Sequence, residues 1–458
     1  MNEPATNTSE ATSVNTASRL ENIREALETG TLRSVRRMMH SLHPAEIAHL
    51  LESLRPAERE VVWELVDAED DGEVLLHVND EVRMGLIRGM DAQELLAATE
   101  DLDIDDLADL FADLPETVTR QLLRSMDDQN RQRLAGVLAY AEDSAGGLMN
   151  TDTVTVRPDV ALDVVIRYLR MREDLPEDTD RLFVVNRYGR LLGTLTLARL
   201  LSNDPSVTIA EVMDTEVKGI PAETSARDVA KLFEDRDLVS APVVDNEGVL
   251  LGRITIDDVV DVIRDQADHS LMTMAGLDED EDMFAPVLSS ARRRALWLGI
   301  NLATATLAAS VVGLFEATLD QIVALAVLMP IVASMGGIAG SQVLTIIIRG
   351  LALGQLERSN VRWFIGKQLA VVGLNAVLLS IVVGLIAYFW FGSPSIGLII
   401  GSALIINLLI ATIAGCGVPL LLKRFNIDPA LAGPVVVMTF TDVMGFLVFL
   451  GLGTIYLL

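Results

Sequence analysis

Cysteine is almost absent from this sequence, and histidine is scarce. Cys416 is the single cysteine in 458 residues, so an internal disulfide is impossible and thiolate metal clusters are excluded. The five histidines show no spacing typical of a zinc site. The sequence also has no P-loop, no phosphorylatable DKTG-like segment and no nucleophile with a matched base. We therefore expect neither an enzyme nor an ATP-driven pump.

Basic residues are scarce in the first 290 positions. The whole chain has 36 Lys and Arg and 65 Asp and Glu, of which 27 basic and 60 acidic residues precede Ala291. The resulting net charge of −33 makes nucleic acid and anionic lipid unsuitable partners for this part. Such a region instead accumulates cations, and carboxylates suit the divalent cations Mg²⁺ and Ca²⁺. Plain solubility is the alternative explanation of this charge.

Long apolar runs are missing before position 295. No signal peptide is visible in the polar residues 1–18, which we expect to form a disordered leader. Five apolar runs then follow one another, each long enough to cross a membrane. They cover about residues 295–315, 322–348, 364–391, 396–422 and 431–458.

The connections between these runs differ in charge. Basic residues precede the first run and lie in the second and fourth connections, whereas the first and third connections have none. By the positive-inside rule, this alternation places the acidic N-terminal part in the cytoplasm and the C-terminus outside. We therefore predict an integral protein of the plasma (inner) membrane, in contact with the lipid bilayer.

Asp442 lies near the middle of the fifth apolar run. A carboxylate at that depth costs on the order of 3 kcal/mol or more, so it normally faces water or a cation. This predicts ion permeation. Because Mg²⁺ keeps several waters and uses one or two carboxylates, a symmetric dimer with two Asp442 side chains at its axis would suit a hydrated divalent cation. We therefore expect a homodimer.

The second run has an unusual content of proline and glycine. Proline removes a backbone donor and glycine lowers helix propensity, so we expect a break in this span after Pro330. A break at membrane depth survives only inside protein or beside a wet cavity, where freed carbonyls can coordinate a cation. Packing of small residues between helices is the alternative, but Asp442 favours a pore. The predicted pore lining is Pro330, Gly336, Gly337, Gly340, Gln342 and Thr441.

Two copies of one pattern fill residues 144–265. Residues 184–193 match residues 243–252, and each copy has an apolar strand, a polar turn with glycine, a second strand and a helix-like run. This repeat resembles a tandem CBS (cystathionine-β-synthase) domain pair. The resemblance implies a sensory module, with ATP as a candidate ligand. An unrelated α+β repeat is the alternative.

Acidic helices are predicted on both sides of this repeat. Residues 45–54 recur as residues 105–114 with Leu and Ile at helical spacing, which favours a stacked helical superhelix. After the repeat, Asp257, Asp258 and Asp261 begin a predicted helix that runs through Met274. Asp258 and Asp261 share one helix face and repel each other unless a cation neutralises them. The acidic run at 278–282 is expected to be a solvated linker.

In the order of its parts, the chain resembles MgtE-type magnesium channels along nearly its whole length. The similar motifs are SAGGLM at 144–149, APVVD at 241–245, ITIDDVVDV at 254–262, ARRRALWLGIN at 291–301, PIVASMGGIAGSQ at 330–342 and TDVMG at 441–445. The resemblance implies a homodimer whose second and fifth spans line the pore, with Asp442 as the Mg²⁺ ligand. It also implies a cytosolic Mg²⁺ sensor that closes the pore and includes Asp237, Asp258 and Asp261, beside which Asp257 lies.

Two features depart from the family pattern. Ile338 stands where many members have Asn, so the polar lining of the pore is altered. The connecting helix, often rich in Glu, here contains Gln266 and His269. Because neutral side chains bind Mg²⁺ less well than carboxylates, we expect weaker or shifted gating by Mg²⁺.

The predicted fold class is a multidomain membrane protein with a cytoplasmic all-α superhelical domain, an α/β tandem CBS pair and a five-helix transmembrane domain. The expected bounds are 1–18 for the leader, 19–140 for the superhelix, 141–265 for the CBS pair, 266–290 for a connecting (plug) helix and linker, and 291–458 for the transmembrane domain. The predicted function is passive, Mg²⁺-gated import of Mg²⁺. The alternatives are a transporter of another divalent cation, such as Co²⁺ or Mn²⁺, and a non-conducting, membrane-tethered nucleotide sensor.

Overall fold

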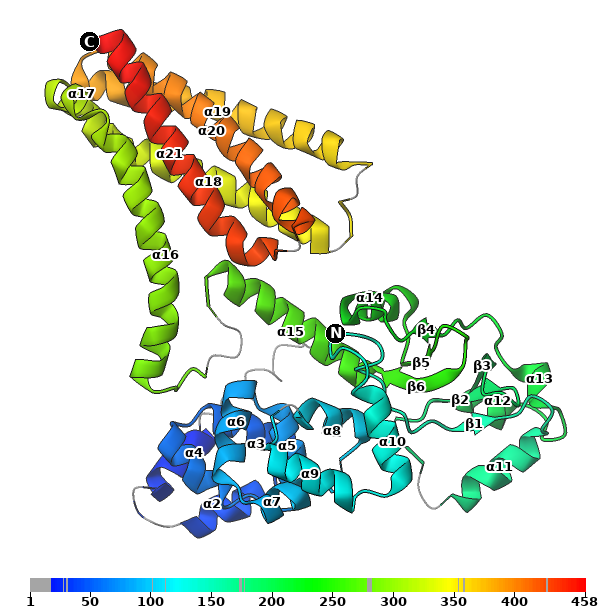
Figure 1. The fold of residues 1–458 in the computed structure, drawn as a ribbon. Helices are drawn as coiled ribbons and strands as arrows, with labels where there is room; N and C mark the ends of the chain where they lie inside the picture. Colours follow the sequence, from blue (N-terminus) through cyan, green and yellow to red (C-terminus); the bar gives the residue numbers. More distant parts are fainter. Residues whose placement is uncertain are drawn as a thin grey trace, which may run out of the picture. The chain divides into compact units, whose positions relative to one another are not determined.

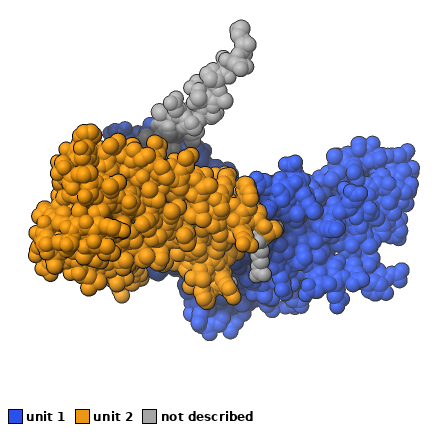
Figure 2. All heavy atoms as spheres, turned by 90° about the horizontal axis from the view of Figure 1, so that it is seen from above, with its two compact units in different colours: residues 1–268, 280–286 blue, residues 269–279, 287–458 orange. Residues whose placement is uncertain are grey.

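The computed structural model describes residues 18–27, 29, 32–100, 102–111, 113–172, 175–176, 178–277, 282–352, 354–356, 359–425 and 427–458. The predicted leader therefore lies outside the described residues except for Ser18, which begins a helical stretch. The chain divides into two compact units, coloured separately in Figure 2. Unit 1 comprises Met1–Asp268 and Asp280–Pro286, and unit 2 comprises His269–Glu279 and Val287–Leu458. The finer domain bounds expected from the sequence stay predictions.

Unit 1 begins with short amphipathic helices, as the spacing of Leu and Ile predicts. They are α2 (Leu32–Met39), α3 (Pro44–Glu52), α4 (Pro56–Trp63), α5 (Asp71–His77), α6 (Asp80–Gly89), α7 (Ala92–Ala98), α8 (Ile104–Phe111), α9 (Glu116–Ser125) and α10 (Asp128–Val137). Their apolar faces share one core, in which Ile47, Leu51 and Leu110 are fully buried. Side-chain caps start several helices; at α6, Asn79 Oδ1 accepts a hydrogen bond from Val82 N at 3.0 Å.

The second part of unit 1 contains two three-stranded sheets with the same topology. Their elements are β1 (Thr155–Val156), α11 (Leu162–Met171), β2 (Arg181–Val185), β3 (Leu191–Thr196), α12 (Leu197–Ser202), α13 (Ile209–Val212), β4 (Ile220–Pro221), α14 (Ala226–Arg236), β5 (Ser240–Val244) and β6 (Leu250–Thr255). In each sheet the first strand is parallel to the second, which is antiparallel to the third. The predicted internal repeat is confirmed.

The turns of the two copies contact each other. Gly189 and Gly248 occupy equivalent turn positions with φ of 77° and 79°, a left-handed conformation that glycine adopts without a steric cost. Leu191 N donates to Gly248 O and Leu250 N donates to Gly189 O, both at 3.0 Å. These reciprocal bonds join the two sheets into one symmetric pair.

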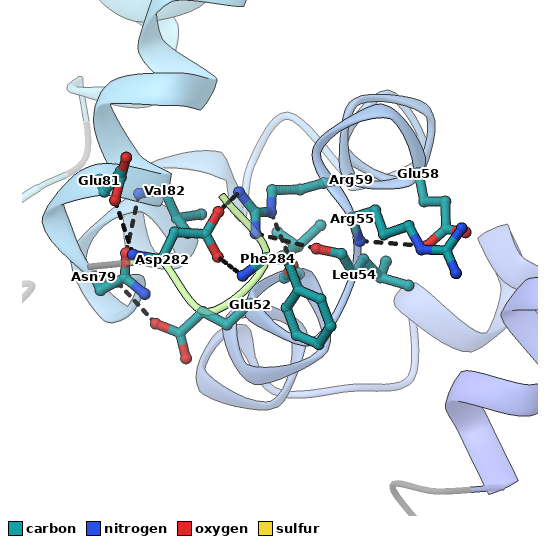
Figure 3. A network of polar contacts seen from close by, with 11 residues as sticks. Glu52, Leu54, Arg55, Glu58, Arg59, Asn79, Glu81, Val82, Asp282 and Phe284 are labelled. Atoms are coloured by element: carbon teal, nitrogen blue, oxygen red, sulfur yellow. Dashed lines mark hydrogen bonds and ion pairs between the residues drawn. The ribbon is translucent and has the colours of Figure 1, made fainter. Parts of the chain in front are cut away.

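The acidic residue at the end of the predicted linker is buried. α15 (Ile256–Met274) follows β6 directly, as expected, and residues 278–281 lie outside the described residues. Asp282, expected to be solvated, is only 4% exposed, and its carboxylate pairs with Arg59 Nη1 at 2.9 Å (Figure 3). Arg59 supplies the charge that makes this burial possible, because a buried carboxylate otherwise lacks compensation for its lost hydration. The expectation of a solvated residue was wrong at Asp282.

Among its described residues, unit 2 contains five helices that are long and apolar enough to cross a membrane, which confirms the predicted number. They are α16 (Val287–Gly313), α18 (Val323–Ala352), α19 (Val361–Phe391), α20 (Pro394–Arg424) and α21 (Pro429–Leu457), and the short α17 (Glu316–Gln321) follows α16. Helix α20 is the most buried of the five and packs against α18, α19 and α21 (Figure 1). Buried apolar side chains such as Leu325, Ile400 and Phe449 form the core between them.

The predicted break in the second span is absent. Helix α18 continues from Val323 to Ala352 with Pro330 inside it. A proline removes only one intrahelical hydrogen bond, and contacts with neighbouring helices allow membrane helices to tolerate that loss. The glycines serve these contacts: Gly415 approaches the carbonyl of Gly340 so closely that a methyl group on Gly415 would lie 2.7 Å from it.

Candidate cation site

An open groove in unit 2 lies between α18 and α21. Its volume is about 540 Å³, and Asp442 is the one ionisable side chain in its lining. Helix α18 contributes most of the wall, and α21 contributes Asp442 and Met438. The complete lining is Ala333, Ser334, Gly337, Ile338, Ser341, Gln342, Thr345, Met438 and Asp442.

The groove wall on α18 follows helical periodicity. Ser334, Ile338, Ser341 and Thr345 recur every three or four residues, which places them on one face of the helix. Because α18 is unbroken, its backbone carbonyls accept hydrogen bonds within the helix, and side chains provide the polar atoms of the groove. This face could have been recognised from the spacing of Ser and Thr, but the expected helix break obscured it.

The structure separates the predicted pore-lining residues into two groups. Gly337 and Gln342 line the groove together with Asp442. Gly336, Gly340 and Thr441 lie behind it, between helices; Gly336 faces the amide of Asn407, Gly340 faces Val437, and Thr441 is fully buried. Pro330 is exposed and lies outside the groove lining.

The chemistry of the groove suits a hydrated divalent cation. Asp442 offers a carboxylate, Gln342 an amide oxygen, and the serine and threonine residues offer hydroxyls. These are hard oxygen ligands of the kind that Mg²⁺ prefers, and the groove is wide enough for an ion that keeps several waters. Exposed Ile338 also lines the groove and makes part of its wall apolar.

A second acidic region lies in unit 1, where α8 faces the beginning of α15. Burial, together with the charges of Asp105 and Asp257, raises the pKa of Asp258 to about 8. Burial and the charges of Asp106 and Asp103 likewise raise the pKa of Asp105 to about 8. Burial and the charge of Asp258 raise the pKa of Asp106 to about 7. A cation would relieve the repulsion among these carboxylates.

The predicted sensor residues differ in their surroundings. Asp258 lies in this acidic region, and it also stabilises the start of α15 by accepting hydrogen bonds from Thr255 N at 3.2 Å and Thr255 Oγ1 at 3.1 Å. Asp257 and Asp261 are exposed near it, and Asp261 pairs with Arg264 at 3.4 Å. Asp237 is the left-handed C-cap of α14, with φ of 50°.

The resemblance implies that acidic residues of the helical domain take part in a Mg²⁺ sensor, but no residue of α8 was named from the sequence. Asp105 is 9% exposed, and among the described residues its Oδ1 has no hydrogen-bond partner. The sequence did contain an indication, because Asp105 and Asp106 belong to the repeated helix motif at 105–114. Their proximity to α15 depends on the tertiary fold. Within the described part of the chain, no three His, Cys, Asp or Glu side chains lie close enough together to hold an ion.

Three family models match different parts of the chain. Residues 42–143 match the model of the MgtE intracellular N domain, and residues 145–205 and 209–265 match the CBS domain. Residues 329–452 match the MgtE divalent cation transporter model.

Two characterised relatives are similar over almost the whole chain. The magnesium transporter MgtE of Thermus thermophilus is 32% identical over 443 residues, which cover 95% of this chain and 98% of the relative. The magnesium transporter MgtE of Bacillus subtilis is 26% identical over 431 residues, which cover 94% and 96%.

Two solved structures resemble the soluble part. The cytosolic domain of the Mg²⁺ channel MgtE in complex with ATP is 33% identical, with a TM-score of 0.49, and covers 53% of this chain and 99% of that chain. The soluble part of a magnesium transporter is 22% identical, with a TM-score of 0.47, and covers 55% and 99%.

Alanine substitution at Gly337 and at Gly340, three residues apart on α18, should have opposite effects on stability. In Gly340→Ala the new methyl group would lie 2.7 Å from Val437 Cγ1, and such overpacking costs about 1–3 kcal/mol. In Gly337→Ala the methyl group meets no atom within 4 Å, and alanine gains up to about 1 kcal/mol of helix propensity. Thermal unfolding of the detergent-solubilised protein should show a lower Tm for Gly340→Ala only. Equal Tm values would contradict the packing role of Gly340.

The raised pKa values of Asp105 and Asp258 predict a pH-dependent stability of the α8–α15 region without metal. The unfolded chain loses these protons near pH 4. The folded protein keeps them up to about pH 8, so their contribution to stability is greatest below pH 4 and is lost as the pH rises through about 8. Hydrogen exchange in the full chain, corrected for intrinsic rates, should show protection of α8 falling at least about tenfold from pH 6 to pH 9. Asp105→Asn should flatten this change, and an unchanged wild-type profile would contradict it.

Proposed function

Because this chain belongs to the MgtE family of magnesium transporters, we propose that it is a passive channel that imports Mg²⁺ along the membrane potential. Mg²⁺ bound to the soluble part would close this channel. The observation that carries the proposal is Asp442, a carboxylate in a groove of about 540 Å³ between two membrane helices. Inward movement of a divalent cation is favoured by about 2.3 kcal/mol per charge at 100 mV, so permeation needs no chemical reaction.

The active form is a homodimer. One chain supplies a single carboxylate to the groove, and a hydrated Mg²⁺ is commonly held by one or two carboxylates. The groove is open in the single chain, which leaves room for a second copy to complete the pathway. Two-fold symmetry would then place two Asp442 side chains around one ion.

Regulation acts through the acidic residues of α8 and α15. The fit to a cation is supported by Asp105, a buried carboxylate whose Oδ1 has no partner among the described residues. Asp105, Asp106 and Asp258 are too far apart to bind one ion directly, so they would contact a hydrated Mg²⁺ through its waters, and its positive charge would offset their mutual repulsion. Bringing α8 and α15 together in this way makes the soluble part more compact when Mg²⁺ is plentiful.

A contact in unit 2 offers a route from α15 to the pore. His269, in the last two turns of α15, lies with Nε2 3.0 Å from Oδ2 of Asp428. Asp428 is the N-cap of α21 and accepts a hydrogen bond from Ala430 N at 2.8 Å through its other oxygen. Asp442 lies on the same helix. His269 therefore serves this contact with α21, although a neutral side chain binds Mg²⁺ less well than a carboxylate.

Orientation and nucleotide binding complete the proposal. The acidic soluble part faces the cytoplasm, because basic residues flank the spans on that side. The CBS pair binds ATP as a regulatory ligand, which its match to the CBS family model supports. The protein catalyses no reaction.

Mg²⁺ uptake into proteoliposomes tests the role of Asp442. Asp442→Asn keeps the size of the side chain and removes its charge, and loss of a charge-assisted contact of about 1.5 kcal/mol or more corresponds to at least about tenfold slower uptake. Asp320→Asn makes the same chemical change at an exposed position of α17 and should leave uptake unchanged. Both variants should elute from size exclusion like the wild type.

Three other outcomes would contradict parts of this proposal. Equal uptake by Asp442→Asn and the wild type would move the ion site elsewhere in the membrane part. Stronger uptake of Co²⁺ or Mn²⁺ in direct competition would assign the protein to another cation. Absence of uptake in every sample, with nucleotide binding retained, would support the membrane-tethered sensor.

A further inference from the structure

Asn407 is a buried polar residue at the centre of the membrane unit. It lies on α20, is fully buried, and donates a hydrogen bond from Nδ2 to the carbonyl of Val332 on α18 at 2.9 Å. This bond joins two helices at membrane depth. Asn407 is absent from the lining of the groove, so it does not touch the path of an ion directly.

Two glycines leave the space that Asn407 occupies. A methyl group on Gly336 of α18 would overlap the Asn407 amide, and one on Gly445 of α21 would lie 2.8 Å from Nδ2. The amide therefore sits between the two helices that form the groove. Gly336 is adjacent to Gly337 in the groove wall, and Gly445 lies three residues after Asp442.

We propose that Asn407 is a positioning residue that sets the separation of α18 and α21 behind the groove and thereby the size of the cation that Asp442 accepts. This inference rests on the proposed function, because it needs Asp442 to meet the permeating ion. An apolar side chain of similar volume could fill the same space, but it could not bind the Val332 carbonyl and fix one orientation. The Asn407 side chain thus fills the space between the helices, and its hydrogen bond to Val332 also fixes how that side chain is oriented.

Ion selectivity distinguishes this role from plain packing. Asn407→Ala removes the hydrogen bond and leaves a gap, so the ratio of Mg²⁺ to Ca²⁺ uptake should change at least fivefold. Thr412→Val is the matched control, because Thr412 is equally buried on α20 but donates only to Leu408 O of its own helix at 2.8 Å. Its uptake ratio should equal that of the wild type. An unchanged ratio in Asn407→Ala, or an equal change in Thr412→Val, would overturn the proposal.

A paired substitution separates positioning from folding. Gly336→Ala should lower the Tm because its methyl group overlaps Asn407, and adding Asn407→Ala should restore the Tm by making room. The uptake ratio should stay altered in this double variant, because the bond to Val332 is still missing. Recovery of the wild-type ratio would show that volume alone matters and would overturn the proposal.

A distance measurement keeps the proposal testable even if the protein conducts no ions. Spin labels at Ile346→Cys on α18 and Phe440→Cys on α21 occupy exposed positions, 46% and 45% exposed. The distance distribution between them should shift in Asn407→Ala and not in Thr412→Val. An unchanged distribution would overturn the positioning role, whereas failure of the proposed function alone would leave the shift intact.

A second, independent observation is the buried ion pair of unit 1 (Figure 3). The side chains of Arg59 and Asp282 are 7% and 4% exposed and lie 223 residues apart in the chain. Arg59 also donates to the carbonyls of Leu51 at 2.9 Å and Leu54 at 3.1 Å, and Asp282 N donates to Glu81 Oε2 at 2.8 Å. Each group that burial removes from water is thus hydrogen-bonded.

The ion pair lies only a few residues before the first membrane helix in the sequence. Residues 282–286 follow α15 and end immediately before α16, the first membrane helix. We infer that residues 282–286 are a latch that fixes the segment immediately before α16 in sequence to α3, α4 and α6 of unit 1, separately from the connection through α15. Movement of these helices would then reach the membrane part along two routes. Without the latch, the proposed closure by Mg²⁺ would depend on α15 alone.

Hydrogen exchange in the full chain tests the latch without reference to transport. Asp282→Asn and Arg59→Gln should each speed exchange at Asp282 and Phe284 at least tenfold, because the amide bonds to Glu81 and to Asp282 Oδ1 depend on the docked segment. Arg133→Gln removes another, more exposed pair of unit 1 and should leave these rates unchanged. The exchanged pair Arg59→Asp with Asp282→Arg should recover part of the protection. Wild-type rates in both single variants would overturn the latch.

Discussion

Several carboxylates that have no positively charged partner among the described residues stand out in this molecule. Asp442 lies in a membrane helix, and Asp105, Asp106 and Asp258 raise one another's pKa in the soluble part. In a low dielectric such groups either keep a proton or attract a cation, because their hydration has been lost. The contrast with Asp282 is informative: there the chain itself supplies Arg59, and the result is a structural contact.

In the membrane part, the backbone polar groups are hydrogen-bonded within the helices, so few backbone atoms are free to coordinate an ion. Helix α18 stays intact through Pro330, so its carbonyls are hydrogen-bonded within the helix and side chains supply the polar atoms of the groove. Small residues make this possible by allowing close helix contacts. The glycines of α18 have two roles: Gly336 and Gly340 make room for neighbouring side chains, whereas Gly337 lines the groove.

The sequence predicted the parts of the fold that depend on long or repeated patterns. Five spans follow from hydropathy, and the two sheets follow from matching turns around Gly189 and Gly248. The fold class and the family were confirmed, whereas the predicted roles of Asp442, Asp237, Asp257, Asp258 and Asp261 stay predictions. The helix break predicted at Pro330 from local propensity was wrong, because contacts with neighbouring helices allow α18 to continue. Asp105 and Asp282 could not be assigned from sequence, because Asp105 interacts with Asp258 and Asp282 pairs with Arg59, both more than about 150 positions away.

The most direct test of passive permeation is the dependence of Mg²⁺ flux on membrane potential in proteoliposomes with no nucleotide and no proton gradient. The account predicts uptake that increases with an inside-negative potential and reverses direction when the potential and the Mg²⁺ gradient are inverted, because a divalent cation gains about 2.3 kcal/mol per charge at 100 mV. A flux that ignores the potential, or that appears only with a proton gradient, would contradict it.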